Sequence, residues 1–538
     1  MQRLIICFGC LMFSYQSNCQ IHFTEIDAGD LSYIPGGYTF DGQRVGGTWI
    51  DFDQDGDIDF FDGYIYYQND GVNHFVADSF IHSGNPPTIV DLNNDRRLDL
   101  ISTNDTLPTT LHINFGNTYE KIILDDSYGY NEASCVDFNN DGLLDILLTD
   151  IDNNNRLYVN KGTTFLPETN QITGSHFSTW ADFDNDGDMD LMCSALYENL
   201  GDGTFERKDD IQGTSWGDYN NDGFEDLFGV LNNHLVIYTN NQGIGFTIDT
   251  IAIADDPFLI GSSWGDLDND GDLDLLISDW NFGHSLFLNN NGILTHINFE
   301  ETYKQSKLSL TEQQLFNPAL PMSLTFGDIN HDGNLDAFIG YDSGTPNQIL
   351  LNVGNTNSWL GLNLEGTESN ANGIGARVTV EAVIDGKVRK QYRQQRSRHG
   401  PNAGNLTMHF GLGNATTVDK LTVEWPSGNV TELQNVDVGQ YLVINEDMVT
   451  SVISEEPTSM IYPNPANEYI TIRSSTDYYG TVLIEIFNMN GKEINSSQIH
   501  KGDGLLEHKM GIQNLATGTY FLKVRLGDQV FIQKIIKE

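Results

Sequence analysis

Five aspartates alternate with other residues in the segment DFDNDGDMD at 182–190. Two unit charges about 4 Å apart repel by about 4 kcal/mol at an effective dielectric constant near 20. Five carboxylates in one turn therefore need a counter-ion, unless some of them keep a proton. A hard divalent cation meets this need, because Ca²⁺ accepts roughly six to eight oxygen ligands in irregular geometry. The segment therefore predicts a calcium site.

The same nine-residue pattern, D-x-[D/N]-x-D-G-x-x-D, recurs along the chain, and we number the copies loops 1 to 7. Successive copies start 40, 46, 45, 36, 48 and 62 residues apart. A repeat of roughly 40–50 residues has the length of a propeller blade. The copies are DFDQDGDID (51–59), DLNNDRRLD (91–99), DFNNDGLLD (137–145), DFDNDGDMD (182–190), DYNNDGFED (218–226), DLDNDGDLD (266–274) and DINHDGNLD (328–336).

Each position in the loop has a predicted role. Positions 1, 3 and 5 point inward, Gly at position 6 permits a sharp turn, position 7 offers its backbone carbonyl and position 9 closes the shell. The first half matches an EF-hand loop, but the closing acid comes too early and strands flank the loop. Mg²⁺, which demands a stricter octahedron, and a metal-free solvated turn are the alternatives. The predicted ligands are Asp51, Asp53, Asp55, Asp57, Asp59, Asp137, Asn139, Asp141, Leu143, Asp145, Asp182, Asp184, Asp186, Asp188, Asp190, Asp218, Asn220, Asp222, Phe224, Asp226, Asp266, Asp268, Asp270, Asp272, Asp274, Asp328, Asn330, Asp332, Asn334 and Asp336.

Loop 2 departs from this pattern, because Arg96 replaces the glycine and Arg97 adds a second positive charge. We expect this loop to bind a cation weakly or not at all, with Arg96 taking the place of the ion. The chain as a whole is then expected to hold about six or seven Ca²⁺ ions. The weak ligands of loop 2 would be Asp91, Asn93, Asp95 and Asp99.

Short strand-like segments flank every loop. After each loop comes an apolar run, a turn and a second run that ends in an Asn/Gly turn, which predicts a radially repeated all-β fold. Seven units predict a seven-bladed β-propeller over residues 20–355, closed by a strand near IHFTEID at 21–27. The residues two places before the loops are interpreted as core between blades rather than as a platform for a ligand. They are Trp49, Ile89, Cys135, Trp180, Trp216, Trp264 and Phe326.

The repeats resemble the VCBS/FG-GAP family, whose calcium-loop blades also occur in integrin α-subunit propellers. The loop core, similar to GDxNxDGxxD, and the element LYENLGDGTF at 196–205 carry the resemblance. It covers about residues 30–355 and implies the fold and the metal. It does not imply a partner, because this scaffold hosts adhesion modules, lectins and some enzymes.

A second β-rich region covers residues 356–446. SNANGIGARV, FGLG and EWPSG occur there in the order of the ASPIC/UnbV domain. This region resembles that domain, which follows such propellers in secreted acidic proteins, including the cartilage acidic protein group. The middle segment, RSRHGPNAGNLTMHF, departs from the glycine- and serine-rich run of the family.

The same region holds the main basic cluster of the chain: Arg377, Lys387, Arg389, Lys390, Arg393, Arg396 and Arg398. Three interpretations stay open. The cluster forms a solvated strand face, or it docks onto the acidic propeller, or it binds a sulfated or uronic polysaccharide. For the last, the candidate ligand-binding residues are Arg389, Arg393, Arg396 and Arg398.

The two ends of the chain indicate export. Residues 1–19 have the composition of a signal peptide, and no later stretch is long and apolar enough to span a bilayer. A linker is expected at 447–459. Residues 460–538 resemble the C-terminal sorting domain of type IX secretion cargo, on YPNPA, NGK and GTYFLKV. This implies a small β-sandwich, the type IX secretion machinery as a partner, and a secreted or outer-surface location.

The complete fold expectation is all-β, with a seven-bladed propeller followed by two small antiparallel β domains of sandwich type. A net charge of −49 and few basic residues before residue 350 argue against nucleic-acid binding. We find no nucleophile elbow, zinc spacing or phosphate loop, and we assign no catalytic residue. The sequence favours a calcium-binding, adhesion-type module for an extracellular glycan or protein. The alternative is a carbohydrate-active enzyme of lyase or dehydratase type, and a structural spacer is a third possibility.

Overall fold

Short β-strands joined by tight turns make up the described part of the chain, which contains no α-helix. The predicted signal peptide at 1–19 lies outside the described residues. The computed structural model describes all residues except 1–20, 27–46, 62–64, 70–73, 79–84, 86, 105, 117, 151–153, 169–171, 175–177, 209–210, 252–256, 258, 280–282, 299–320, 342–346, 400–401, 404–405, 449–450, 453–458, 463–465, 475–479, 489–491, 503–505, 527–528 and 538.

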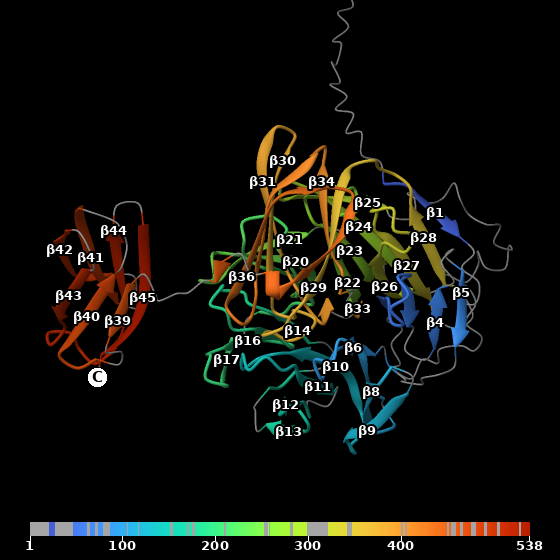
Figure 1. The fold of residues 1–538 in the computed structure, drawn as a ribbon, viewed down its shortest axis with the longest axis horizontal. Helices are drawn as coiled ribbons and strands as arrows, with labels where there is room; N and C mark the ends of the chain where they lie inside the picture. Colours follow the sequence, from blue (N-terminus) through green and yellow to red (C-terminus); the bar gives the residue numbers. More distant parts are fainter. Residues whose placement is uncertain are drawn as a thin grey trace, which may run out of the picture. The chain divides into compact units, whose positions relative to one another are not determined.

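Seven four-stranded antiparallel sheets lie between Phe23 and Asn352 among these residues (Figure 1). Such repeated sheets are the blades of a β-propeller. Their strands are β2 (Thr48–Ile50), β3 (Asp59–Phe61), β4 (Tyr66–Asn69), β5 (Phe75–Asp78); β6 (Thr88–Val90), β7 (Asp99–Ser102), β8 (Thr109–Asn114), β9 (Tyr119–Asp125); β10 (Tyr130–Val136), β11 (Asp145–Asp150), β12 (Arg156–Asn160), β13 (Phe165–Glu168); β14 (Thr179–Ala181), β15 (Asp190–Met192), β16 (Leu196–Asn199), β17 (Phe205–Lys208); β18 (Ser215–Gly217), β19 (Asp226–Leu231), β20 (His234–Asn240), β21 (Phe246–Ile251); β22 (Leu259–Gly265), β23 (Asp274–Asp279), β24 (Gly283–Asn290), β25 (Ile293–Asn298); and β26 (Pro321–Gly327), β27 (Asp336–Tyr341), β28 (Gln348–Asn352), β1 (Phe23–Ile26).

The last strand of a blade is more exposed than the inner strands. All six residues of β11 are buried, whereas four of the seven residues of β9 are exposed. Strands that are buried on both faces are expected to be near-continuous apolar runs, and the runs after each loop have that composition. Each nine-residue loop joins the first strand of its blade to the second, so position 9 is the first residue of the second strand.

The ring closes through the N-terminal strand, as the sequence predicted. β1 pairs antiparallel with β28, with Phe23 opposite Asn352. The first and last blades also contact each other, because the ring centroids of Phe60 and Phe338 are 4.3 Å apart.

Large side chains before the loops pack against small residues of the preceding blade. A Cβ atom added to Gly217 would lie 2.9 Å from the ring of Trp264, and one added to Gly327 would lie 2.9 Å from the ring of Trp49. Six of the seven residues at this position are buried, and Trp264 is half-buried. All seven pack between blades, as predicted, and Trp216, Trp264 and Phe326 also line a pocket that is described below.

The second β domain follows directly and has one hydrophobic core, which includes Leu362, Val380 and Phe410. Its sheets have the orders β34-β29-β37 and β31-β30-β35-β36-β38. The expectation of purely antiparallel pairing is wrong for β29 and β37, which are parallel. A long connection separates these two strands, and such a connection permits parallel pairing. The elements are β29 (Ser358–Glu365), β30 (Arg377–Ile384), β31 (Lys387–Gln394), β32 (Arg398–His399), β33 (Asn402–Ala403), β34 (Met408–Gly413), β35 (Thr417–Glu424), β36 (Asn429–Asp437), β37 (Gln440–Asn445), the 3₁₀ turn η3 (Glu446–Met448) and β38 (Ser451–Val452).

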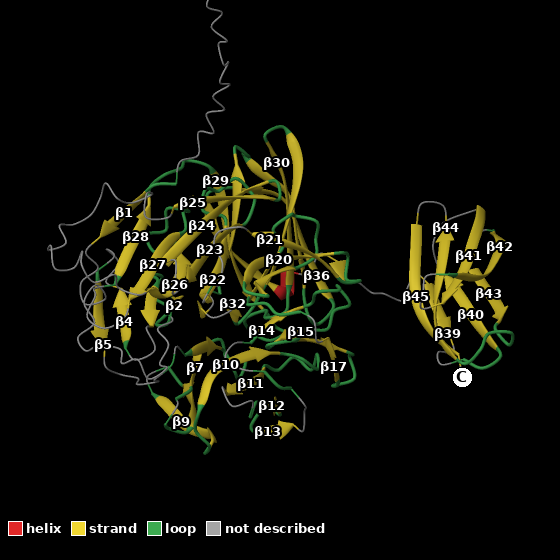
Figure 2. Cartoon of the chain, turned by 180° about the vertical axis from the view of Figure 1, so that it is seen from behind, coloured by secondary structure: helices red, strands yellow, loops and turns green. Residues whose placement is uncertain are grey.

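A two-stranded hairpin of this domain, formed by β32 and β33, contacts the first strands of several blades. β33 lies against β2, β22 and β26, and β32 lies against β14. Figure 2 shows β32 close to β14. The segment that departs from the family pattern therefore lies at the centre of the propeller.

The chain divides into two compact units, Met1–Val452 and Ile453–Glu538. The second unit has a three-stranded sheet, β39-β40-β43, and a four-stranded sheet, β42-β41-β44-β45. Both sheets contribute to one core, which includes Ile472, Ile486 and Leu522. This arrangement is the predicted β-sandwich. Its strands are β39 (Ser459–Tyr462), β40 (Tyr469–Ser474), β41 (Gly480–Asn488), β42 (Glu493–Lys501), β43 (Leu506–Gly511), β44 (Gly518–Leu526) and β45 (Gln529–Lys537).

Ring closure by β1 predicts a large effect of Phe23, which is fully buried. Phe23→Ala should destabilise the protein by about 3–5 kcal/mol, the usual cost of truncating a buried phenylalanine. Thermal unfolding measures this change, and Val76→Ala, at a side chain that is 48% exposed on another outer strand, is the control. Equal melting temperatures for the two variants would contradict closure through β1.

Candidate metal loops and an interdomain pocket

Two residues with positive φ fold each loop. In loop 4 these are Asn185 at position 4, with φ 59°, and Gly187 at position 6, with φ 93°. Asparagine tolerates this left-handed conformation better than most residues, and glycine adopts it freely. The alternation of short polar residues and glycine in the sequence therefore produces a tight turn that gathers the carboxylates.

The backbone of the loop orients the carboxylates at positions 1 and 5. In loop 4, Asp182 accepts hydrogen bonds from the N–H groups of Asp186 and Gly187, both at 3.0 Å. Asp186 accepts one from the N–H group of Asp188 at 2.9 Å. These bonds hold the side chains in place before any cation binds.

The aspartate at position 9 is buried and is held from two sides. Asp190 accepts a hydrogen bond from the N–H group of Phe183 at 3.0 Å and another from that of Asn199 at 2.8 Å. Asn199 in turn donates from its side chain to the carbonyl of Phe138 in the preceding blade, at 2.9 Å. This asparagine therefore connects the loop, its own blade and the neighbouring blade.

The same asparagine recurs in every blade, near the end of the third strand, and its N–H group always donates to the aspartate at position 9. The sequence reasoning treated it as a turn residue and missed this role. The available signal was its recurrence 9 to 16 residues after position 9. The seven residues are Asn69, Asn114, Asn160, Asn199, Asn240, Asn289 and Asn352.

Carboxylate oxygens from positions 1, 3 and 9 converge in three loops. In loops 1, 4 and 6 these oxygens lie within 4.8 Å of one another, which permits one ion to contact all three. The other four loops have asparagine at position 3, whose amide oxygen is also a ligand that Ca²⁺ accepts. The acidic clusters could therefore hold metal ions. The sets of three are Asp51, Asp53 and Asp59; Asp182, Asp184 and Asp190; and Asp266, Asp268 and Asp274.

Burial raises the pKa of these carboxyls, and neighbouring carboxylates raise it further. The pKa of Asp59 rises to about 7, and the pKa values of Asp190 and Asp226 rise to about 9. In each case loss of hydration is the largest cause. A bound divalent cation would reverse this preference, because it stabilises the charged form.

Loop 2 keeps the fold of the other loops, but an arginine side chain supplies the positive charge beside its carboxylates. Arg96 occupies position 6 with φ 67°. Its side chain is 58% exposed and lies 3.9 Å from a carboxylate oxygen of Glu365. The expectation that Arg96 takes the place of the ion is therefore wrong. The neighbouring Arg97, at position 7, forms an ion pair with Asp95 of the loop instead.

Side chains at position 4 link each loop to the next one around the ring. Asn185 of loop 4 donates to the carbonyl of Gly223 in loop 5 at 3.0 Å. Asn221 of loop 5 donates to the carbonyl of Gly271 in loop 6 at 3.1 Å. His331 is the exception, and its ring lies 5.1 Å from the ring of Tyr441 in the second domain.

The second domain covers the loops on this side of the ring. Arg377 donates to the carbonyl of Gly223 at 2.7 Å, and Tyr441 donates to the carboxylate of Asp328. Loop 6 is buried by this contact, and Asn269 at its tip is 0% exposed. The nine-residue loops are therefore part of the contact between the two domains.

The basic cluster docks onto the acidic propeller. Arg396 forms an ion pair with Glu225 at 2.6 Å, and Arg398 lies 3.6 Å from a carboxylate oxygen of Glu132. Arg389 lies 3.4 Å from a carboxylate oxygen of Asp272. The docking interpretation is confirmed for these residues. Because Arg396 and Arg398 are 5% and 4% exposed, they offer no free surface to a polysaccharide.

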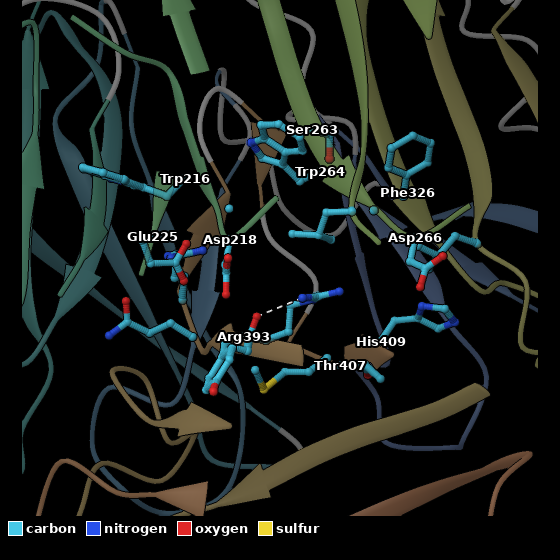
Figure 3. A pocket seen from close by; sticks show the side chains of 18 of the residues that line it. Trp216, Asp218, Glu225, Ser263, Trp264, Asp266, Phe326, Arg393, Thr407 and His409 are labelled. Carbon is cyan, nitrogen blue, oxygen red and sulfur yellow. Dashed lines mark hydrogen bonds and ion pairs between the residues drawn. The ribbon is translucent and has the colours of Figure 1, made fainter. Parts of the chain in front are cut away.

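A pocket of about 120 Å³ lies between the propeller and the second domain. Trp216, Glu225 and Trp264 line it from the propeller, and Arg393 and His409 line it from the second domain. Figure 3 shows Trp216 and Glu225 on one side, His409 on the other side, and Arg393 between them. The loop pattern alone could not reveal this pocket, because its walls come from segments that are distant in sequence.

Three family descriptions match parts of the chain. Residues 137–193 and 218–277 match the FG-GAP-like repeat, 366–451 match ASPIC and UnbV, and 460–538 match the secretion system C-terminal sorting domain. The chain therefore carries the three kinds of domain that the sequence resembled. The sorting domain implies interaction with type IX secretion and suggests secretion or attachment at the cell surface.

A search of curated proteins finds no match. Among the residues that the structure describes, none forms an apolar helix of membrane-spanning length.

Solved structures match with low similarity. One is described as BBS1N in complex with ARL6DN, soaked with mercury, with a TM-score of 0.41, 10% identity, and coverage of 62% of this chain and 99% of that chain. Another is the Trypanosoma rangeli sialidase, with a TM-score of 0.27, 8% identity, and coverage of 93% and 89%. The propeller assignment rests on the sheets described above.

The raised pKa values predict an unusual pH dependence when divalent cations are removed. Unfolded aspartate loses its proton near pH 4, whereas folded Asp59 keeps it to about pH 7 and folded Asp190 to about pH 9. In this window the folded state binds more protons, so the free energy of unfolding falls as pH rises. In EDTA the melting temperature should therefore fall between about pH 5 and pH 8, and saturating Ca²⁺ should weaken this dependence.

Matched variants test whether the loop carboxyls cause this fall in melting temperature with pH. Asp190→Asn should reduce it, whereas Asp202→Asn, at an exposed turn outside the loops, should not. A melting temperature in EDTA that stays constant or rises over this range would contradict the interpretation.

Loop 2 can be converted to the pattern of loop 3. The double substitution Arg96→Gly and Arg97→Leu reproduces DGLLD and frees the carboxylate of Asp95. We expect about one additional Ca²⁺ per chain, since oxygen ligands then surround an unoccupied centre. Equilibrium dialysis measures the stoichiometry, and an unchanged value would show that the arginines are not what excludes the ion.

Proposed function

We propose that this chain is an exported, calcium-stabilised propeller module that binds an extracellular glycan or protein without changing it chemically. The convergence of carboxylates in loops 1, 4 and 6 carries the calcium part of this proposal. Hard oxygen ligands in an irregular shell favour Ca²⁺ over Mg²⁺, which demands near-ideal octahedral geometry.

Six of the seven loops would hold Ca²⁺ in this proposal, and loop 2 would hold none. Positions 1, 3 and 5 would supply side-chain oxygens, position 7 a backbone carbonyl, and position 9 the closing carboxylate. Each ion would then tie the first strand of its blade to the second, because position 9 begins the second strand. In loop 2 the ion pair between Arg97 and Asp95 performs the same neutralisation.

Export would use two signals. Residues 1–19 would direct the chain through the general secretory pathway and be removed. The second compact unit would then be recognised by the type IX machinery, which supports a location outside the cell. A calcium-dependent fold suits that location, because extracellular modules bind Ca²⁺ with dissociation constants of about 10⁻⁴–10⁻³ M.

The pocket favours a second candidate, a carbohydrate-active enzyme. Burial lowers the pKa of His409 to about 4, so its imidazole is neutral near pH 7. Nε2 of His409 lies 3.0 Å from the carbonyl of Gly333, which can only accept a hydrogen bond. The proton is therefore on Nε2, and Nδ1 retains a free electron pair that could act as a base.

Removal of Ca²⁺ tests the metal assignment. At roughly one hundred times its dissociation constant, each ion adds about 2.7 kcal/mol of stability. EDTA should therefore lower the melting temperature markedly, and Ca²⁺ should restore it. Asp266→Asn should reduce this stabilisation, whereas Asp202→Asn should leave it intact. An unchanged melting curve in EDTA would count against calcium in the loops.

Incubation with a panel of polysaccharides separates the two candidates. The purified full-length chain should retain at least one polysaccharide or extracellular protein without generating reducing ends or unsaturated uronate absorbance. Turnover would overturn the binding proposal in favour of the enzyme, and His409→Gln would then be expected to abolish it.

A further inference from the structure

The pocket between the domains has the size of a site for one small ring. Its volume is about 120 Å³, and an engineered protein cavity of roughly 150 Å³ is known to hold one benzene molecule. The walls come from the first strands of three consecutive blades, through Trp216, Trp264 and Phe326, and from the second domain. A pyranose carries hydroxyl groups that benzene lacks, so part of such a ring would extend beyond a pocket of this volume.

Polar atoms without partners line this pocket. Nε1 of Trp216, a residue that is 3% exposed, has no hydrogen-bond partner among the described residues, and neither does Nε1 of Trp264. Glu225 is 8% exposed, and it uses Oε1 for the ion pair with Arg396 while Oε2 has no partner. Buried polar groups are normally hydrogen-bonded, so the unpartnered carboxylate oxygen of Glu225 is available to accept a hydrogen bond from a polar ligand.

In the neighbouring blade, another side chain of the protein accepts the hydrogen bond of the equivalent indole N–H group. Trp180 occupies the same place before loop 4, and its Nε1 donates to Ser134 at 2.9 Å. Trp180 does not line the pocket. Nε1 of Trp49, which also precedes a loop and does not line the pocket, has no partner in the described part of the chain either, so the unpartnered indole N–H groups alone do not indicate a ligand, and the acceptor atoms of Glu225 and His409 carry the argument.

Both donors and acceptors line the wall of the pocket. Indole N–H groups can only donate, and the carboxylate oxygen of Glu225 can only accept. His409 adds an acceptor, because Nδ1 has no partner and Nε2 donates to Gly333. Hydroxyl groups both donate and accept, so a ring with several hydroxyl groups would satisfy this set. The faces of the aromatic rings would pack against the C–H groups of such a ring.

The charges of the pocket nearly cancel. Arg393 and Arg396 oppose the carboxylates of Asp218, Glu225 and Asp266, all of which line the pocket. The two loop aspartates accept hydrogen bonds from the backbone of their own loops. A strongly charged ligand would gain little from this environment, so a neutral ligand is favoured.

We propose that the pocket between the propeller and the second domain binds one neutral pyranose ring of a glycan. This proposal rests on the proposed binding function and specifies its ligand class and its site. Trp216, Trp264 and Phe326 supply apolar walls, and Glu225 and His409 accept hydrogen bonds from ring hydroxyls. Arg393 and the indole N–H groups donate to the hydroxyl oxygens.

Titration of the calcium-saturated full-length chain with methyl glycosides tests this site. Methyl glucoside, galactoside, mannoside and fucoside are the neutral probes, and glucuronate and galacturonate are the charged ones. Saturation-transfer NMR detects contact, and calorimetry gives the dissociation constant. At least one neutral glycoside should bind more tightly than either uronate.

Matched variants locate the binding. Trp216→Phe should weaken it by about five- to tenfold, the effect of losing one hydrogen bond and part of a ring. Trp180→Phe, at the equivalent place outside the pocket, should not change it. Glu225→Gln should weaken binding, whereas Glu132→Gln, which alters another buried ion pair between the domains, should not. Melting temperatures in Ca²⁺ verify that each variant is folded.

Several results would overturn the proposal. These are absence of binding by every neutral glycoside, preference for a uronate, or equal effects of each variant and its control. Retention of a polysaccharide with no binding of any glycoside would refute the sugar site in the pocket. The proposed binding function would then still stand. Failure of the whole polysaccharide and protein panel would instead refute the proposed function.

Discussion

Repulsion among carboxylates in the nine-residue loops is the constraint on which the propeller depends. Oxygens from three aspartates lie within 4.8 Å of one another in loops 1, 4 and 6. At that separation each pair of charges repels by about 3–4 kcal/mol for an effective dielectric constant near 20. The fold must therefore protonate these groups, pair them with arginine as in loop 2, or bind a divalent cation. The clustering is tolerable in the folded state only if one of these conditions holds.

The loops also hold the first compact unit together. The recurring asparagine fixes the aspartate at position 9 and reaches the preceding blade, while position 4 reaches the next loop. The second domain then binds several loops directly, for example through Arg377 and Tyr441. A change of charge in one loop therefore affects its blade, the neighbouring loop and the docked domain. This arrangement gives the nine-residue loops a structural role in the first compact unit.

Much of the fold could be predicted, because its determinants are local and repeated. The spacing of the loops and the large residues before them indicated blades, and β1 closed the ring as expected. Features that depend on contacts across the sequence were not accessible. Sequence spacing could not show that Arg97, rather than Arg96, pairs with loop 2. Nor could it show that β37 pairs parallel to β29, or that the arginines at 393–398 lie against propeller residues near 132 and 225.

A crystal structure of the full-length chain grown in millimolar Ca²⁺ tests the central claim most directly. The account predicts anomalous density for one ion in each of loops 1, 3, 4, 5, 6 and 7, in contact with the aspartates at positions 1 and 9. It predicts no ion in loop 2, where the guanidinium of Arg97 faces Asp95. Loops that contain only water between their carboxylates under these conditions would contradict it.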